Sequence, residues 1–122
     1  MEAYGRHLIL EMWDCKREVL NDADKIIELI SDAAIEAGAT VIIPSGITGV
    51  AILAESHIAI HTWPVEGYVA ADVFTCGMNC DPQLAVNLLI SGFEPKDHTT
   101  LEVKRGSPLI KGTLLSEAFS AV

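Results

Sequence analysis

The chain has 122 residues, half of them hydrophobic, which suits one compact domain with a sizeable core. Its 17 acidic and 8 basic residues give a net charge of −9, which excludes a binder that would neutralise nucleic-acid phosphates with a basic stripe. The same charge suits a small cationic substrate. No apolar run reaches the roughly 18 residues of a membrane span. From the charge and the absence of such a run, we expect neither nucleic acid nor membrane as a partner.

The cysteines and the first residues indicate the compartment. Cys15, Cys76 and Cys80 are an odd set and give no disulfide framework. The opening string, MEAYGRH, lacks the basic start and the apolar core of a signal peptide. We therefore expect a cytoplasmic protein.

A strand and a helix are predicted first along the chain. Residues 7–13 are rich in apolar side chains and predict a strand. Over residues 21–37 the apolar side chains follow helical spacing and form one stripe. Asn21 or Asp22 is a suitable N-cap for this helix, and Gly38 a suitable stop.

The middle of the chain is rich in strand signals. Residues 40–43 are mostly β-branched and predict a strand, and the Pro-Ser-Gly sequence at 44–46 predicts a turn. Three more strands are predicted over residues 50–54, 56–62 and 68–75. Consecutive strands of this kind favour an antiparallel sheet.

A second helix and a last strand complete the predicted fold. Asp81-Pro82 gives a cap followed by proline at the first helical position, and this helix should end near Gly92. Residues 99–104 predict the closing strand, and the tail after Gly106 is expected to be peripheral. The order predicts an α+β fold, a two-layer α/β sandwich with a mainly antiparallel sheet and two helices on one face. We expect a second copy of the chain to cover the other face.

The segment ESHIAIHTWP, residues 55–64, combines a strand pattern with polar side chains. Isoleucines alternate with His57, Ala59 and His61, so these three side chains should project from the same side of the strand. An imidazole in an apolar strand needs a hydrogen-bond partner. Two such histidines, taken alone, are more often ordinary structural side chains than site residues.

The wider string AESHIAIHTWP, with YVAADVFTCG after it and GRHLILE near the N-terminus, resembles the prokaryotic S-adenosylmethionine decarboxylase family. Members of that family are self-processing proenzymes that make their own pyruvoyl group. The resemblance runs from about residue 5 to residue 106, which is most of the chain. It also implies a homodimer with active sites between the protomers.

The resemblance implies that the single domain, residues 1–122, cleaves itself between Glu55 and Ser56. The products would be a β chain, residues 1–55, and an α chain, residues 56–122. The Ser56 hydroxyl would attack the preceding carbonyl, and β-elimination would leave a pyruvoyl group as the only cofactor. Its ketone would form a Schiff base with the substrate and accept the electrons released with carbon dioxide.

Three more residues take roles by resemblance. His61 would transfer protons during processing, and Cys76, in the FTCG motif, would donate a proton during decarboxylation. Thr48 stands where the family has a helper serine, so it would support processing.

Cys80 with His57 and His61 lacks a standard zinc spacing, and we expect no metal. Cys15 is expected to be structural.

Two segments depart from the family pattern. The connection at 44–47 is short and lacks the aromatic residue that stacks on the adenine of the substrate. Val65 stands where the family usually has the glutamate that binds the ribose, with Glu66 one position later. Glu66, Tyr68 and Glu11 are therefore weaker candidates for substrate binding.

The predicted function is pyruvoyl-dependent decarboxylation of S-adenosylmethionine in the synthesis of polyamines such as spermidine. Because both departures affect nucleoside recognition, an alternative stays open in which the chain is a pyruvoyl-dependent decarboxylase of arginine or ornithine, like relatives in the same superfamily. An alternative of another class is an uncleaved, non-catalytic binding subunit.

Overall fold

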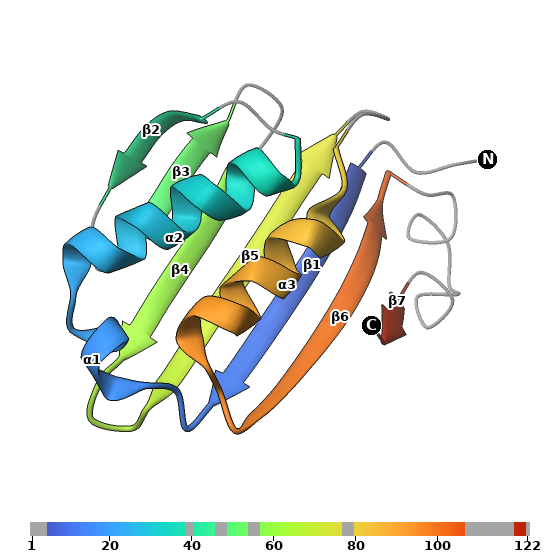
Figure 1. The fold of residues 1–122 in the computed structure, drawn as a ribbon. Helices are drawn as coiled ribbons and strands as arrows, with labels where there is room; N and C mark the ends of the chain where they lie inside the picture. Colours follow the sequence, from blue (N-terminus) through green and yellow to red (C-terminus); the bar gives the residue numbers. More distant parts are fainter. Residues whose placement is uncertain are drawn as a thin grey trace.

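The computed structural model describes residues 5–38, 41–45, 49–53, 57–76, 80–106 and 119–121. Within these residues, seven strands form one antiparallel sheet, and the helices pack on one of its faces (Figure 1). The spatial order of the strands is β2-β3-β4-β5-β1-β6-β7. The elements are β1 (Gly5–Trp13), α1 (Arg17–Leu20), α2 (Ala23–Glu36), β2 (Val41–Ser45), β3 (Gly49–Leu53), β4 (His57–Trp63), β5 (Tyr68–Cys76), α3 (Pro82–Phe93), β6 (Asp97–Arg105) and β7 (Phe119–Ala121).

The predicted α+β two-layer sandwich is confirmed. Alternation along the central strands sends one set of side chains toward the helices, where an apolar stripe on each helix meets them. Each large side chain buried there contributes roughly 1.5–3 kcal/mol by leaving water. The fully buried members of this core include Leu8, Leu10, Met12, Ile58, Ile60, Val69, Val73, Ile26, Ile30, Leu89 and Phe93.

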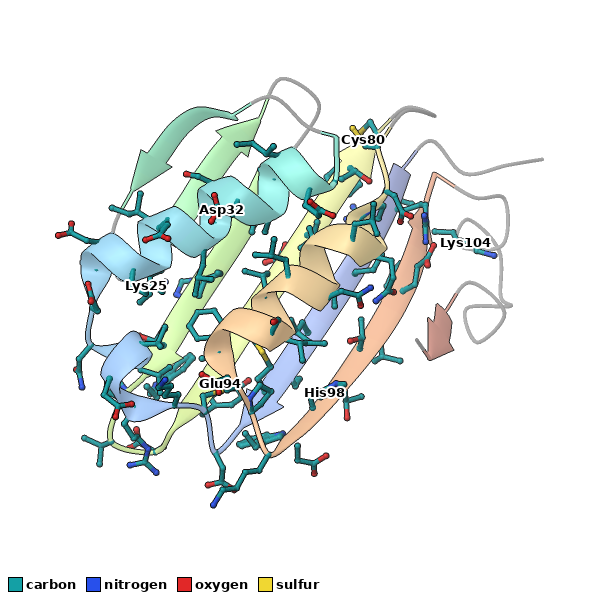
Figure 2. All side chains as sticks on the ribbon, in the orientation of Figure 1. Lys25, Asp32, Cys80, Glu94, His98 and Lys104 are labelled. Carbon is teal, nitrogen blue, oxygen red and sulfur yellow. The ribbon has the colours of Figure 1, made fainter. Side chains whose placement is uncertain are left out.

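Acidic caps start both long helices, as the sequence predicts. The Asp22 side chain accepts a hydrogen bond from the Lys25 backbone N–H at 3.0 Å, and Asp81 accepts one from that of Gln83 at 3.0 Å. Such caps satisfy backbone donors that have no partner inside the helix. Charged residues of the helix layer, among them Lys25 and Glu94, are exposed to solvent (Figure 2).

Three elements differ from the prediction. Pro44 and Ser45 were expected in a turn but belong to β2, which lies at the edge of the sheet, the position where strands tolerate proline. β6 is not the last strand, because β7 pairs with it, with Leu101 opposite Ala121. α1 was not predicted, since four residues are too few to show a period. Within the described residues, no helix is long and apolar enough to cross a membrane.

Candidate active site

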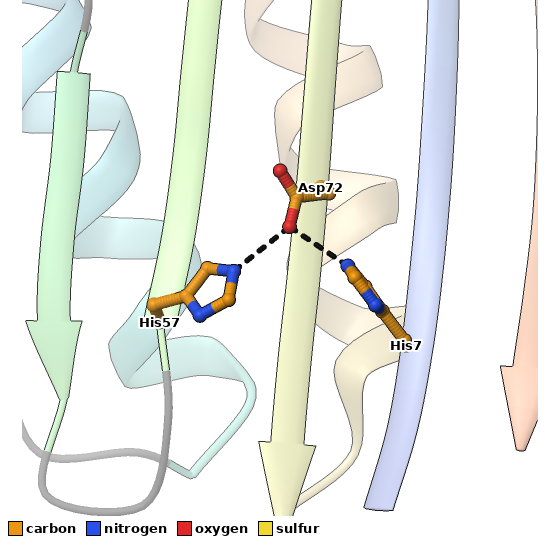
Figure 3. A group of neighbouring side chains, drawn as sticks. All are labelled: His7, His57 and Asp72. Carbon is orange, nitrogen blue, oxygen red and sulfur yellow. Dashed lines mark hydrogen bonds and ion pairs between the residues drawn. The ribbon is translucent and has the colours of Figure 1, made fainter. Parts of the chain in front are cut away.

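Two histidines and a carboxylate from three neighbouring strands meet on the face of the sheet that carries no helix. Nε2 of His7 on β1 and Nε2 of His57 on β4 each lie 2.8 Å from the same oxygen, Oδ2 of Asp72 on β5. Figure 3 views this His–Asp–His cluster with the helices behind the strands. All three side chains are partly buried, with exposed fractions of 19%, 39% and 31% for His7, His57 and Asp72.

The strand register explains the convergence. Phe74 on β5 is paired with His7 on one side and with His57 on the other. Asp72 precedes Phe74 by two residues, so it lies on the same face and diagonally from both imidazoles, within reach of long side chains. The Phe74 ring packs between them, with its centroid 5.3 Å from that of His7 and 5.8 Å from that of His57.

Arg105 closes the cluster on the side of β6. Its guanidinium carbon lies 5.5 Å from the centroid of the Phe74 ring, and its Nη1 lies 3.2 Å from Nδ1 of His7. Burial opposes ionisation of Asp72, but the hydrogen bonds from His7 and His57 outweigh it and lower the pKa of that carboxyl below its ordinary value. Asp72 is therefore ionised at neutral pH.

Sequence reasoning did not find His7 or Asp72 as site residues. A lone aspartate inside the apolar strand YVAADVFTC was the available signal, because charged side chains are rarely buried without a partner. The metal grouping considered from the sequence, Cys80 with His57 and His61, is not assembled. The Cys80 thiol instead lies 3.7 Å from the Gly38 carbonyl oxygen, on the helix side of the fold. In the described part of the chain, the group of three or more possible ligand atoms within 4.8 Å of one another consists of His7, His57 and Asp72.

Cys76 lies at the same end of the sheet as this cluster. It is the last residue of β5, two positions beyond Phe74, and it pairs with Gly5 at the start of β1. β4 begins at His57, so Cys76 and His57 lie close to the position where cleavage is predicted. Glu55, Ser56 and Thr48 themselves lie outside the described residues, and their roles stay predictions.

His61 lies on the expected face of β4 but away from the cluster. Four residues separate it from His57 along the strand, which corresponds to about 13 Å at the rise of an extended chain. Its imidazole is exposed, and its ring centroid lies 6.4 Å from that of Trp63. His61 therefore belongs to the other half of the strand from the predicted cleavage position.

An aromatic group occupies the opposite end of the helix-free face. The Tyr68 ring stacks on Trp13 with centroids 4.3 Å apart and lies 5.0 Å from the Trp63 ring. Trp13 and Trp63 are 48% and 44% exposed. The Tyr68 hydroxyl donates a hydrogen bond to Oε2 of Glu11, so the structure brings two of the three substrate-binding candidates together. The third, Glu66, is exposed in the turn between β4 and β5.

Comparisons with known proteins show the family of the chain. The model of the S-adenosylmethionine decarboxylase family matches residues 6–106. A protein of Methanococcus aeolicus named S-adenosylmethionine decarboxylase proenzyme is 42% identical over 88% of this chain and 97% of its own length. A protein of the same name from Pelotomaculum thermopropionicum is 44% identical over 96% of this chain and 97% of its own.

A solved structure extends the likeness to the fold. The crystal structure of adenosylmethionine decarboxylase from Aquifex aeolicus superimposes with a TM-score of 0.81 at 31% identity and covers 88% of this chain and 94% of that one. The family model and these relatives each span most of the chain. The chain therefore belongs to the S-adenosylmethionine decarboxylase family.

Proposed function

We propose that the chain is the proenzyme of a pyruvoyl-dependent S-adenosylmethionine decarboxylase of polyamine synthesis, acting in the cytoplasm. It would cleave itself between Glu55 and Ser56 into residues 1–55 and 56–122. Family membership and the proenzyme names of the relatives support this function. They support S-adenosylmethionine as substrate rather than arginine or ornithine. They also favour an enzyme over an uncleaved binding subunit.

One structural observation supports roles for particular residues in this function. A thiol, two imidazoles and a carboxylate, those of Cys76, His7, His57 and Asp72, gather at the end of the sheet where β4 begins. These groups fit a pyruvoyl group at position 56, because they can hold and move protons there without a metal. That group supplies the electron sink for loss of the carboxylate. Cys76 would donate the proton that replaces carbon dioxide on the product.

The distance between His57 and His61 supports a site shared by two copies of the chain. At about 13 Å along a regular strand, His61 is too far to exchange a proton with a group next to His57 in the same chain. We therefore assign the proton transfer of the β-elimination step, which splits the ester, to His61 of the partner subunit. Thr48 would support processing with its hydroxyl.

The helix-free face supports the same assembly. It carries exposed apolar side chains, including Trp13 at 48%, Trp63 at 44% and Leu101 at 39%. Trp13 and Trp63 both contact the Tyr68 ring, and an exposed apolar patch of this kind on a small domain suits an interaction site. A homodimer in which two sheets face each other would bury it and would enclose the His–Asp–His cluster. The net charge of −9 would favour a cationic substrate over an anionic one at the entrance.

Substrate recognition is assigned to the aromatic end of the face. Val65 is 83% exposed and offers no acceptor for ribose hydroxyls. Glu11 and Tyr68 offer a carboxylate and an aromatic ring instead, and Glu66 lies in the neighbouring turn. These residues would bind the nucleoside or the cationic part of the substrate.

Intact mass and denaturing electrophoresis test the proposal. The wild-type chain should yield two fragments, residues 1–55 and 56–122, whereas Ser56→Ala should keep the fold and stay whole. Carbon dioxide release should be seen with S-adenosylmethionine and not with arginine or ornithine. An active protein that consists of one unbroken chain would refute the proposal, and activity on a basic amino acid alone would refute the substrate.

A further inference from the structure

We propose that Asp72 is the positioning residue of His57, and that it holds the proton of neutral His57 on Nε2 so that Nδ1 is the basic atom. This inference rests on the proposed function, since it assigns His57 a proton-transfer role at the neighbouring residue 56. His57 would accept the hydroxyl proton of Ser56 as Oγ attacks the carbonyl carbon of Glu55. It would return that proton to the amide nitrogen of residue 56 as the C–N bond breaks, which leaves an ester and a free amine.

Arg105 fixes the proton of His7. A guanidinium has only donors, so the contact of 3.2 Å between Nη1 of Arg105 and Nδ1 of His7 requires that Nδ1 accept. A neutral imidazole that accepts at one nitrogen carries its proton on the other. Nε2 of His7 therefore donates to Oδ2 of Asp72 at 2.8 Å.

Asp72 in turn fixes the proton of His57. An ionised carboxylate only accepts hydrogen bonds, so Nε2 of His57, also at 2.8 Å, must donate to it. The lone pair of neutral His57 is then on Nδ1. An acid that orients a histidine in this way also stabilises the imidazolium formed when the histidine takes up a proton.

The same contacts argue against a metal ion in the cluster. A metal would need the lone pair of Nε2 on His7, which would move the proton to Nδ1, in front of the Arg105 donors. Histidines that bind metals instead donate their second N–H to a carboxylate or a carbonyl. The Arg105–His7–Asp72–His57 chain has the order of donors and acceptors that proton positioning needs.

Asp72→Asn gives a selective test, because asparagine offers one acceptor and one donor group. Arg105 keeps His7 as a donor, so the asparagine oxygen should turn to His7 and its NH₂ group to Nε2 of His57. The His57 proton would then move to Nδ1, and the base would be lost. Proton transfer by a positioned group contributes 10²–10⁴-fold in general, so cleavage should slow by on the order of 100-fold.

Nitrogen NMR reads the tautomer independently of cleavage. In the uncut Ser56→Ala chain, the His57 ring should show its proton on Nε2, and in Ser56→Ala with Asp72→Asn on Nδ1. The melting temperature checks that both variants are folded. A wild-type chain that never cuts itself would refute the proposed function, but the NMR result would still decide how Asp72 holds His57.

A second substitution should rescue the first. Adding His7→Gln to Asp72→Asn removes the fixed donor, so the asparagine oxygen can turn to His57. The double variant should cleave at least about tenfold faster than Asp72→Asn alone, and its His57 proton should return to Nε2. Wild-type cleavage by Asp72→Asn, or a double variant as slow as the single one, would overturn the proposal. Zinc that raises the melting temperature of Ser56→Ala only when Asp72 is present would also overturn it, in favour of a metal site.

Discussion

The Tyr68 hydroxyl donates a hydrogen bond to Oε2 of Glu11 across the pairing of β5 with β1. Burial of the phenol, together with this bond and the nearby carboxylate charge, raises the pKa of Tyr68 to about 12. The folded protein thus holds the neutral phenol more firmly than the unfolded chain, in which the pKa of tyrosine is 10.0.

The raised pKa of Tyr68 in the folded protein gives a prediction at alkaline pH. The stabilisation from Tyr68 is fully present below about pH 10 and is lost as the pH rises toward about 12, because the unfolded chain releases its proton first. The free energy of unfolding of the wild type should therefore fall more steeply over this range than that of Tyr68→Phe. Denaturant titrations at several pH values measure it, and parallel slopes for the two proteins would contradict the coupling.

The separation of His57 and His61 predicts complementation between two defective chains. Ser56→Ala lacks the nucleophile, and His61→Gln lacks the imidazole that takes up the proton in β-elimination, so neither should cleave alone. When the two are co-expressed, a mixed dimer joins Ser56 of one chain to His61 of the other. The His61→Gln chain, marked by a tag, should then be cut. If it stays whole in isolated mixed dimers, His61 does not act across the interface.

Cys76 should be needed for turnover but not for cleavage. Cys76→Ala removes the thiol at the end of β5, so the chain should process normally while kcat falls by on the order of 100-fold, the usual contribution of a positioned proton donor. Cys15→Ala is the matched control, because Cys15 is 4% exposed and burial raises its pKa to about 11. That control should turn over normally, and normal turnover by Cys76→Ala would remove Cys76 from the mechanism.

The local rules in the sequence account for most of the fold. Alternation predicted the central strands, and the acidic caps at Asp22 and Asp81 predicted where α2 and α3 begin. The errors fall at Pro44, at β7 and at α1. An edge strand tolerates proline, and elements of three or four residues carry too little pattern. Pro44 and β7 also depend on which strand lies at the edge, which the local sequence does not contain.

The sequence predicted which face of β4 carries the histidines, but not which residues from other strands join His57 in the cluster. Alternation placed His57 and His61 on one face, as observed, and strand rise alone separates them by about 13 Å. The partners of His57 come from other strands. Asp72 lies 15 residues away from it along the chain, and His7 lies 65 residues from Asp72. Only the pairing of both neighbours with Phe74 brings these side chains together.

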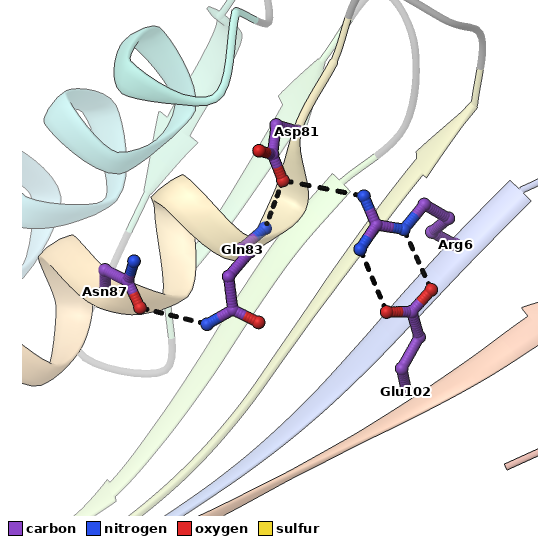
Figure 4. Close-up of polar contacts among 5 residues, drawn as sticks. All are labelled: Arg6, Asp81, Gln83, Asn87 and Glu102. Atoms are coloured by element: carbon purple, nitrogen blue, oxygen red, sulfur yellow. Dashed lines mark hydrogen bonds and ion pairs between the residues drawn. The ribbon is translucent and has the colours of Figure 1, made fainter. Parts of the chain in front are cut away.

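A second ion-pair network, on the helix side of the sheet, ties β1 to β6 and to the start of α3. Arg6 donates two hydrogen bonds to the Glu102 carboxylate, at 2.8 and 2.9 Å, and its Nη1 lies 3.5 Å from Asp81 (Figure 4). Glu102 is 7% exposed. The bond from Arg6 outweighs burial and lowers the pKa of Glu102 below its ordinary value of 4.5.

Glu102→Gln should therefore destabilise the fold in a pH-dependent way. Hydrogen bonds to charged groups contribute about 1.5–3 kcal/mol, and because the Arg6 side chain is 43% exposed, we expect a loss of about 1 kcal/mol at neutral pH. Since the folded-state pKa is lowered, the contribution is present above about pH 4.5 and is lost as the pH falls through the folded value. The stabilities of variant and wild type should then converge in acid.

Glu94→Gln is the control, because its pair with Lys16 at 3.3 Å is exposed on both sides and should contribute close to nothing. A loss at Glu102 that persists unchanged in acid would mean that packing, rather than charge, stabilises this position.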